Sequence, residues 1–315
     1  MRKIFAVLIA VCSLPSCVKE VDVFLPDDPT LTNSAFKELF QDIQPVAQTF
    51  QVSTHRDTTL NSTQGVHLFI PAGAFTSLNG DAVNGVVEVQ LSQAFRKGSW
   101  IANRMTTTTQ HDLFEHLGAV HILAMKNNAQ LKLSPLSKLR FDIPRMAGDE
   151  QALLFRGIND QEGRTLWLDI HSQTEVHQNE VFDAQNQQWQ TSWQWEVAAT
   201  GWYACGKYVP VEQASETTFC MTLPEGFDGT NTAAFAVFQH NNSIVELEWR
   251  ASEKQFCTTH IPIGYAVTLL SISAKDDQNH YLGYAEITLE ENGVPIPIQP
   301  IGTTPAIFAE LLDEL

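Results

Sequence analysis

Apolar and polar residues alternate one by one along several stretches of this chain, and this alternation constrains the fold more than any other feature. In residues 86–92, Val87, Val89 and Leu91 fall on one side of an extended chain and polar residues fall on the other. An Asn-Gly pair at 84–85 marks a turn beside them. The same alternation recurs in residues 138–143, 218–223, 245–250 and 267–270. Short strands with one wet face, separated by turns, predict antiparallel sandwiches rather than a parallel sheet.

Two short segments have helical spacing instead. Residues 34–44 carry an apolar stripe, with Asn33 or Ser34 as the N-cap and Pro45 as the stop. The Thr-Pro pair at 304–305 opens a second helix, because proline suits the first helical position. The predicted fold class is therefore all-β, with two antiparallel β-sandwich-like domains, a short N-terminal helix and a short C-terminal helix.

Length and charge narrow the classes of function. The 315 residues exceed what one hydrophobic core usually serves, so two domains are expected. Apolar residues make up 43% of the sequence, which excludes a disordered chain. The formal net charge is -17 and the sequence has no Lys/Arg cluster, so no nucleic-acid partner is expected.

The N-terminus has the features of an export signal. Arg2 and Lys3 precede the short apolar run 4–11, which is too short to span a bilayer. Residues 14–17 read Leu-Pro-Ser-Cys and resemble the lipobox of bacterial lipoproteins. This resemblance implies that residues 1–16 are removed and that Cys17 carries lipid, which anchors the protein in a membrane.

Residues 17–22 read Cys-Val-Lys-Glu-Val-Asp and are similar to the export signal of surface lipoproteins in Bacteroidota. The similarity implies the outer membrane and favours its outer face. The alternative is an ordinary polar tether on the periplasmic face. Prolines at 26 and 29 fit a tether that holds the body away from the membrane.

A family resemblance covers most of the remaining chain. Residues 64–75 read Gln-Gly-Val-His-Leu-Phe-Ile-Pro-Ala-Gly-Ala-Phe and, with residues 84–91, resemble the opening of ZU5-like β domains. The Gly-Trp strand at 201–208 and the turn at 260–265 are similar to segments of uncharacterised Bacteroidota lipoproteins with a ZU5-like domain and a C-terminal β domain. The resemblance implies protein contacts and brings no catalytic residue with it.

These patterns divide the chain into five segments. The predicted segments are a signal peptide (1–16), a lipidated tether with a short helix (17–45), a ZU5-like β-sandwich (46–145), a β-rich connecting region (146–207) and a C-terminal β-sandwich-like domain with the terminal helix (208–315).

No candidate motif for catalysis or metal binding has the residue spacing and the partner motifs that its chemistry requires. His111 and His116 are five residues apart, so on a helix they would diverge by about 140° rather than converge on one ion. Ser34 and Lys37 match Ser-x-x-Lys, but the partner motifs of acylating hydrolases are missing, and Ser34 suits a helix cap. The sequence predicts no enzyme, no cofactor and no metal site.

Three tryptophans and one glutamine of a single predicted strand form the clearest candidate ligand site. A strand over 189–197 puts Trp189, Trp193 and Trp195 on one face and Gln194 on the other. Indoles beside amides are typical of sugar-binding surfaces, but cores also take indoles first, because each buries 150 Å² or more. Both interpretations, a core strand and an exposed platform for glycan or partner, stay open.

Two covalent modifications are further hypotheses. Cys220 and Cys257 lie in similar strand contexts, so a disulfide between them is one possibility, and three buried thiols with Cys205 are the other. Asp57-Thr58-Thr59 resembles an O-glycosylation site of these bacteria, with Thr58 as the acceptor.

The sequence as a whole therefore predicts a non-enzymatic, lipid-anchored outer-membrane protein that contacts envelope or extracellular proteins. The lipid on Cys17 is expected to attach the protein to the membrane. The alternative function is glycan binding by the tryptophan strand.

Overall fold

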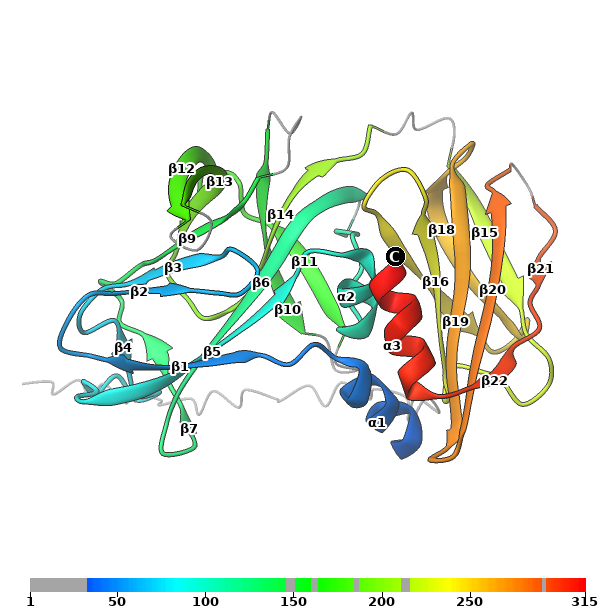
Figure 1. Cartoon of the computed structure of the whole chain (residues 1–315). Coiled ribbons are helices and arrows are strands. Elements are labelled where there is room, and N and C mark those ends of the chain that lie inside the picture. The colour runs from blue at the N-terminus through cyan, green and yellow to red at the C-terminus, as the bar shows by residue number, and fades with distance from the viewer. Residues whose placement is uncertain are drawn as a thin grey trace, which may run out of the picture. The chain divides into compact units, whose positions relative to one another are not determined.

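The computed structural model describes residues 33–110, 112–145, 151–159, 164–183, 187–210, 216–290 and 293–315. The predicted signal peptide, Cys17 and the tether up to residue 32 lie outside the described residues. The chain from residue 32 onward forms one compact unit. It is mostly β, with several antiparallel sheets and short helices near both ends, which confirms the predicted fold class (Figure 1).

The first half of this unit contains two facing sheets. Sheet 1 runs in the order β1 (Gln48–Ser53), β5 (Val86–Ala94), β6 (Phe114–Lys126), β14 (Gly201–Tyr208), β10 (Leu153–Asn159) and β11 (Thr165–Asp169), with β7 (Ala129–Gln130) paired to β6. Sheet 2 runs in the order β12 (His177–Asp183), β13 (Gln188–Val197), β9 (Leu139–Pro144), β3 (His67–Ile70) and β2 (Thr58–Asn61). A small pair, β4 (Phe75–Thr76) and β8 (Lys132–Leu133), lies beside them.

Alternation in the sequence determines which side chains fill the space between sheets 1 and 2. Val87, Val89 and Leu91 of β5 are buried there, as the pattern of 86–92 predicts. Phe141 of β9 and Trp195 of β13 enter the same core from sheet 2, with ring centroids 5.7 Å apart. Strands from 153–208 pair with strands from 46–145 in both sheets, so the predicted connecting region supplies strands to the same sandwich.

The second half contains one large sheet. Sheet 3 runs in the order β21 (Ile296–Pro297), β15 (Glu216–Thr222), β18 (Gln255–Pro262), β17 (Ile244–Arg250), β16 (Thr232–Phe238), β19 (Ala266–Asp276), β20 (Asn279–Thr288) and β22 (Ile301–Thr303). All seven residues of β16 are buried. Alternate residues of that strand enter two different cores, so both of its faces are covered.

Three helices pack between sheet 1 and sheet 3. They are α1 (Ser34–Ile43), α2 (Lys97–Ala102) and α3 (Pro305–Glu314). Helix α1 is capped by Asn33, whose side-chain oxygen accepts the Phe36 N–H at 2.7 Å, and α3 begins after Thr304 as predicted. Helix α2 was not predicted. It approaches α3 so closely that a Cβ on Gly98 would lie 1.7 Å from the Leu312 carbonyl oxygen, so only glycine fits there.

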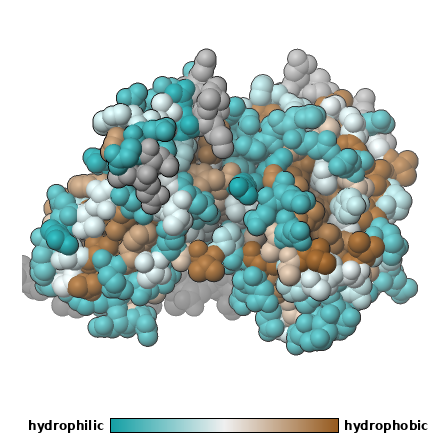
Figure 2. Space-filling view, viewed as in Figure 1, coloured by the Kyte–Doolittle hydropathy of each residue, from teal (hydrophilic) through white to brown (hydrophobic). Residues whose placement is uncertain are grey.

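The helices share one core with both sheets, and this core joins the two halves. It contains Phe36, Trp100, Phe155, Phe235 and Phe308, all almost completely buried. The surface drawn in Figure 2 shows apolar residues scattered among polar ones. No helix of the described residues is long and apolar enough to cross a bilayer.

Candidate functional site

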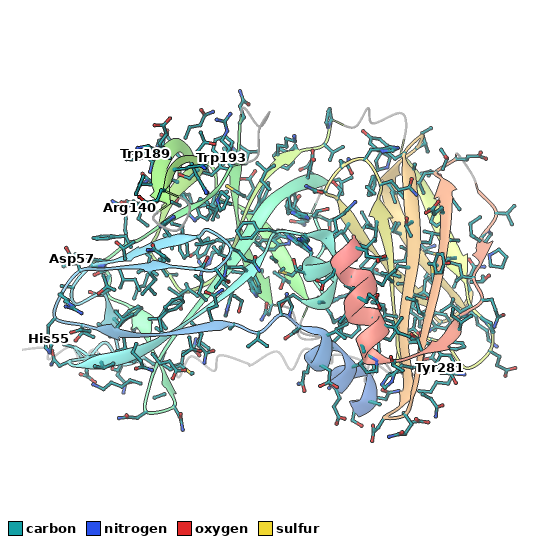
Figure 3. All side chains as sticks on the ribbon, viewed as in Figure 1. His55, Asp57, Arg140, Trp189, Trp193 and Tyr281 are labelled. Carbon is teal, nitrogen blue, oxygen red and sulfur yellow. A yellow bond between two sulfur atoms is a disulfide. The ribbon has the colours of Figure 1, made fainter. Side chains whose placement is uncertain are left out.

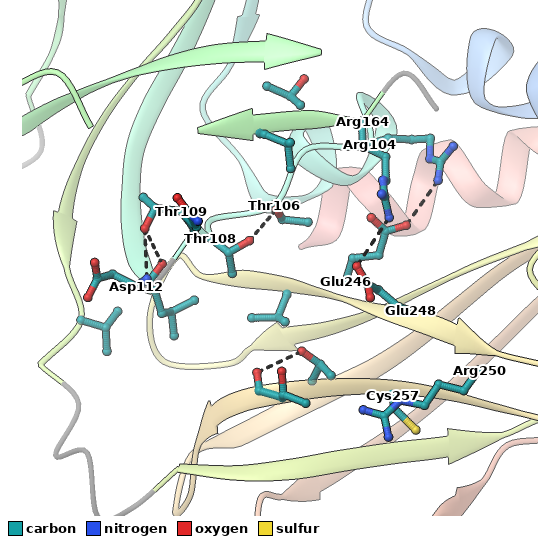
Figure 4. A pocket seen from close by; sticks show the side chains of 18 residues that line it. Arg104, Thr106, Thr108, Thr109, Asp112, Arg164, Glu246, Glu248, Arg250 and Cys257 are labelled. Carbon is teal, nitrogen blue, oxygen red and sulfur yellow. Dashed lines mark hydrogen bonds and ion pairs between the residues drawn. The ribbon is translucent and has the colours of Figure 1, made fainter. Parts of the chain in front are cut away.

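A pocket of about 720 Å³ lies where sheet 1 meets sheet 3 (Figure 4). Its walls come from the loop after α2, from the start of β11, and from β17 and β18. Six threonines place hydroxyls on the walls: Thr106, Thr108, Thr109, Thr165, Thr258 and Thr259. Six charged residues also line it: Arg104, Arg164, Arg250, Asp112, Glu246 and Glu248. Equal numbers of positive and negative groups give the lining no net formal charge.

Hydrogen bonds between Thr107 and the Ile244 backbone hold the loop after α2 against β17. The Thr107 N–H donates to the Ile244 carbonyl at 2.8 Å, and the Ile244 N–H donates to the Thr107 hydroxyl at 2.7 Å. Arg104, with φ at 52°, turns the chain out of α2 in the left-handed region. The loop therefore lies along the edge of β17 as a short added strand would.

Arg104 and Glu246 form the most enclosed ion pair of the pocket. The guanidinium Nη2 lies 3.3 Å from Glu246 Oε1, and both side chains are largely buried. The Arg104 guanidinium also lies over the rings of Phe36 and Phe40, 5.5 and 5.7 Å from their centroids. Burial raises the pKa of the Glu246 carboxyl, and Arg104 opposes that rise. The pair thus couples α1, the pocket loop and β17.

A second ion pair lies nearer to solvent. Arg164 Nη1 is 3.8 Å from Glu248 Oε1, and the Glu248 side chain is 74% exposed. Since exposed pairs of this kind contribute little to stability, the Glu248 carboxylate adds little to the stability of the pocket.

Strands β17 and β18 diverge at the pocket. Their ladder pairs Arg250 with Gln255, Trp249 with Phe256, and Glu248 with Cys257, and it ends there. Residues 244–247 of β17 and 258–262 of β18 continue beyond the ladder. We call this opening the β17–β18 split. Glu246 from one strand and Thr259 from the other both line the pocket.

The disulfide joins β15 to β18 beside the split. Cys220 and Cys257, the pair proposed from their sequence context, lie opposite each other in the ladder and are bonded. Cys257 is also the β18 residue opposite Glu248, where the β17–β18 ladder ends. Cys205 is a buried thiol in the core between sheets 1 and 2. The covalent bond therefore fixes β18 to β15 next to the point where it leaves β17.

The tryptophan row divides between core and surface (Figure 3). Trp193 and Trp195 are 2% and 1% exposed, whereas Trp189 is 68% exposed near the turn of the β12–β13 hairpin. Gln194 donates its amide to Asp142 Oδ1 at 2.8 Å on the other face. The three indoles thus do not form an exposed platform, because the strand carries two of them into the core between sheets 1 and 2.

Thr58 begins β2, at the edge of sheet 2. Its hydroxyl points back to the Arg56 carbonyl, 3.5 Å away, and the residue is half-buried. The preceding Asp57 accepts the Ala72 N–H at 2.8 Å, which fixes the turn before the strand.

Two histidines of the 111–121 segment, His116 and His121, lie on β6, and His111 lies outside the described residues. Burial, with a contribution from Lys97, lowers the pKa of His116 to about 3, and its ring stacks on Trp100 at 4.5 Å. Burial lowers the pKa of His121 to about 4. Among the described residues, no group of three or more His, Cys, Asp or Glu side chains is placed to hold a metal ion.

Sequence reasoning did not find the pocket. The threonine run 106–109 is the main low-complexity tract of the sequence, and it forms one wall, but the pattern carries no information about its position. Glu246 appears only as a polar residue on the wet face of a predicted strand. Its pairing with Arg104 joins residues 142 positions apart, which no local pattern specifies.

The chain matches no protein-family model, no curated protein and no solved structure.

Proposed function

We propose that this protein is a lipid-anchored, non-enzymatic component of the outer membrane that binds another protein. The observation that carries the binding proposal is an exposed apolar row on the β10–β11 hairpin. Ile158, Leu166 and Leu168 are 40%, 48% and 47% exposed, and Ile158 lies directly opposite Leu166 in the ladder. We call these three side chains the β11 row.

The position of the β11 row favours a protein partner. Strand β11 is the last strand of sheet 1, and beyond the bridge between Met105 and Thr165 its outer edge pairs with no other described strand. An exposed apolar edge strand is a common place for another chain to attach. Leu166 also lines the pocket, so the row continues into a polar concave surface. An apolar centre with a polar surround is the usual composition of a protein interface.

The membrane anchor is proposed from the N-terminal sequence. The lipobox-like residues 14–17 make Cys17 the lipidated residue, and residues 17–22 favour export to the outer face. A Cys17→Ser variant tests this part alone. It should accumulate as an unprocessed precursor without lipid, and normal processing of the variant would contradict the proposal.

Chemical crosslinking of the native protein in outer membranes, followed by affinity purification and mass spectrometry, tests the binding function. We expect one stoichiometric protein partner with the wild type. A Leu166→Asp and Leu168→Asp double variant should lose that partner, because two carboxylates cannot be desolvated at an apolar contact without a large cost.

Leu136→Asp is the matched control, since Leu136 is 98% exposed and lies outside the row. That variant should keep the partner. If the wild type yields no stoichiometric partner, or the double variant keeps it unchanged, the proposed function is wrong.

A further inference from the structure

We propose that the β17–β18 split is a peptide-binding slot, in which an extended segment of the partner protein adds as a strand along Glu246 and Thr259. The inference rests on the proposed function and specifies its mode: the partner is recognised through its main chain as well as through the β11 row.

The hydrogen bonds on either side of Glu246 show where its backbone points. In an antiparallel strand, the N–H and C=O of one residue point to the same neighbour, and successive residues alternate. The Ser243 carbonyl accepts the Phe238 N–H at 3.0 Å, so Ser243 points to β16. Ile244 bonds through both of its backbone groups to Thr107, on the opposite side.

Glu246, two residues after Ile244, must therefore point its N–H and C=O away from β16 and into the split. Glu248, two residues further on, points the same way and meets Cys257 of β18. Continuing that register by two residues would place Glu246 opposite Thr259, but the ladder stops before this pair. The β17–β18 ladder thus provides no partner for the Glu246 backbone, and the pocket lies in the place of the missing pair.

The protein itself shows that this edge accepts an added segment. Thr107, from a loop 137 residues away in sequence, occupies the edge position at Ile244 with three hydrogen bonds to the Ile244 backbone. A peptide lying next to Glu246 would extend the same edge by one hydrogen-bonded position. Strand addition to a free edge uses main-chain bonds for affinity and side-chain pockets for specificity.

The charge of the lining favours a neutral backbone over a small ion. Arg104 is matched by Glu246 and Arg164 by Glu248, and the lining as a whole carries no net formal charge. The volume of about 720 Å³ lies within the range of pockets that enclose small ligands, and a short peptide segment falls in that size class. Peptide N–H and C=O groups can exchange hydrogen bonds with the threonine hydroxyls of both walls.

Side-chain specificity would come from the ends of the slot. Leu166 offers an apolar contact at the β11 side, and Arg250 lies across the pocket on β17 (Figure 4). Extended peptides with an apolar residue at the β11 side of the slot should therefore bind best.

The test uses the full-length processed protein in detergent micelles and a displayed library of linear heptapeptides as the probe. Enriched peptides are synthesised and their affinities measured for three proteins: the wild type, Thr108→Trp and Thr288→Trp. Thr108 lines the pocket from the loop, so an indole there fills the slot without interrupting a strand. Thr288 is an exposed residue at the end of β20 and is the control for adding an indole to the surface.

We expect the dissociation constant to rise by about tenfold or more in Thr108→Trp and to stay unchanged in Thr288→Trp. N-methylation should weaken binding at the peptide amides that face Glu246 and also at those that face Thr259, because a strand between two edges donates alternate N–H groups to each of them. Failure to enrich any peptide, equal binding by Thr108→Trp, or tolerance of methylation at all positions would overturn the inference.

These outcomes are separate from those of the crosslinking experiment. If the native partner is captured by the wild type and equally well by Thr108→Trp, the slot is wrong and the proposed function stands. If no partner is captured, the proposed function fails, and the peptide measurements judge the slot by themselves.

Discussion

The two-sheet sandwich and sheet 3 differ in how an amphipathic strand pairs with its neighbours. In the sandwich, β13 pairs continuously with β9 from Ser192 to Val197, and its inward indoles fill the core. In sheet 3, β17 pairs with β16 along its first half and with β18 along its second half. A polar pocket in a β protein therefore needs no gap in the hydrophobic core, because a strand that changes its pairing partner is enough to open one.

We expect the largest change in stability in the two-sheet sandwich, where strand pairing is continuous. Trp193→Ala should lower the free energy of unfolding by about 3–5 kcal/mol, since it removes a buried indole from the sandwich core. Trp189→Ala, on the same face of the same strand, should change it by no more than about 0.5 kcal/mol, because the side chain is 68% exposed. Urea unfolding measures both. Similar values for the two variants would show that the core does not end between them.

Removal of the disulfide in sheet 3, beside the β17–β18 split, should have the next largest effect on stability. Replacing both Cys220 and Cys257 by Ala should cost about 2–4 kcal/mol, because the bond closes a loop with a sequence separation of 37. Unfolding midpoints of wild type and variant, with and without reductant, measure this. Cys205→Ala is the control and should keep the wild-type response to reductant. A double variant as stable as the oxidised wild type would contradict the bond.

The junction between the two regions contains a group that responds to pH. His116 on β6 lies beside the chain entering β17, since its N–H donates to the Asn242 carbonyl at 2.9 Å. Its folded-state pKa of about 3 is below the ordinary 6.5, so the unfolded chain binds the proton more readily. The contribution to stability is complete above pH 6.5 and is lost as pH falls toward 3, at about 1.4 kcal/mol per pH unit.

A His116→Phe variant should flatten that pH dependence, because phenylalanine keeps the stacking on Trp100 and removes the proton site. Part of the slope should remain, since His121 has a pKa of about 4 and acts in the same direction. Chemical unfolding between pH 4 and 7 measures the slope, with the exposed His240→Gln as the control. A variant slope equal to that of the wild type would mean that the pKa of His116 is the same in the folded and unfolded states.

Sequence reasoning performs well where local pattern decides the structure. Alternation in 86–92 identifies the inward side chains of β5, and the Asn33 and Thr304 caps identify both terminal helices. The sequence does not predict helix α2, because its six residues, with Gly98 in the second position, have no helical pattern of their own. It forms because α3 covers it at Gly98.

Site prediction is harder, because periodicity shows which side of a strand is apolar and not where the core ends. Trp189, Trp193 and Trp195 share one face, yet only the last two lie under sheet 1. The pocket depends on contacts between residues more than 100 positions apart, such as Thr107 with Ile244. The alternation in 245–250 is the same whether or not β18 stays paired with it.

Amide hydrogen exchange in sheet 3 tests the central claim, that the β17–β18 ladder opens before Glu246, most directly. Resolved by residue in the full-length protein, the Glu246 amide should exchange about tenfold or more faster than those of Val245 and Leu247, which point to β16. Equal protection of Glu246 and its two neighbours would mean that the ladder is closed, and the pocket as described would not exist.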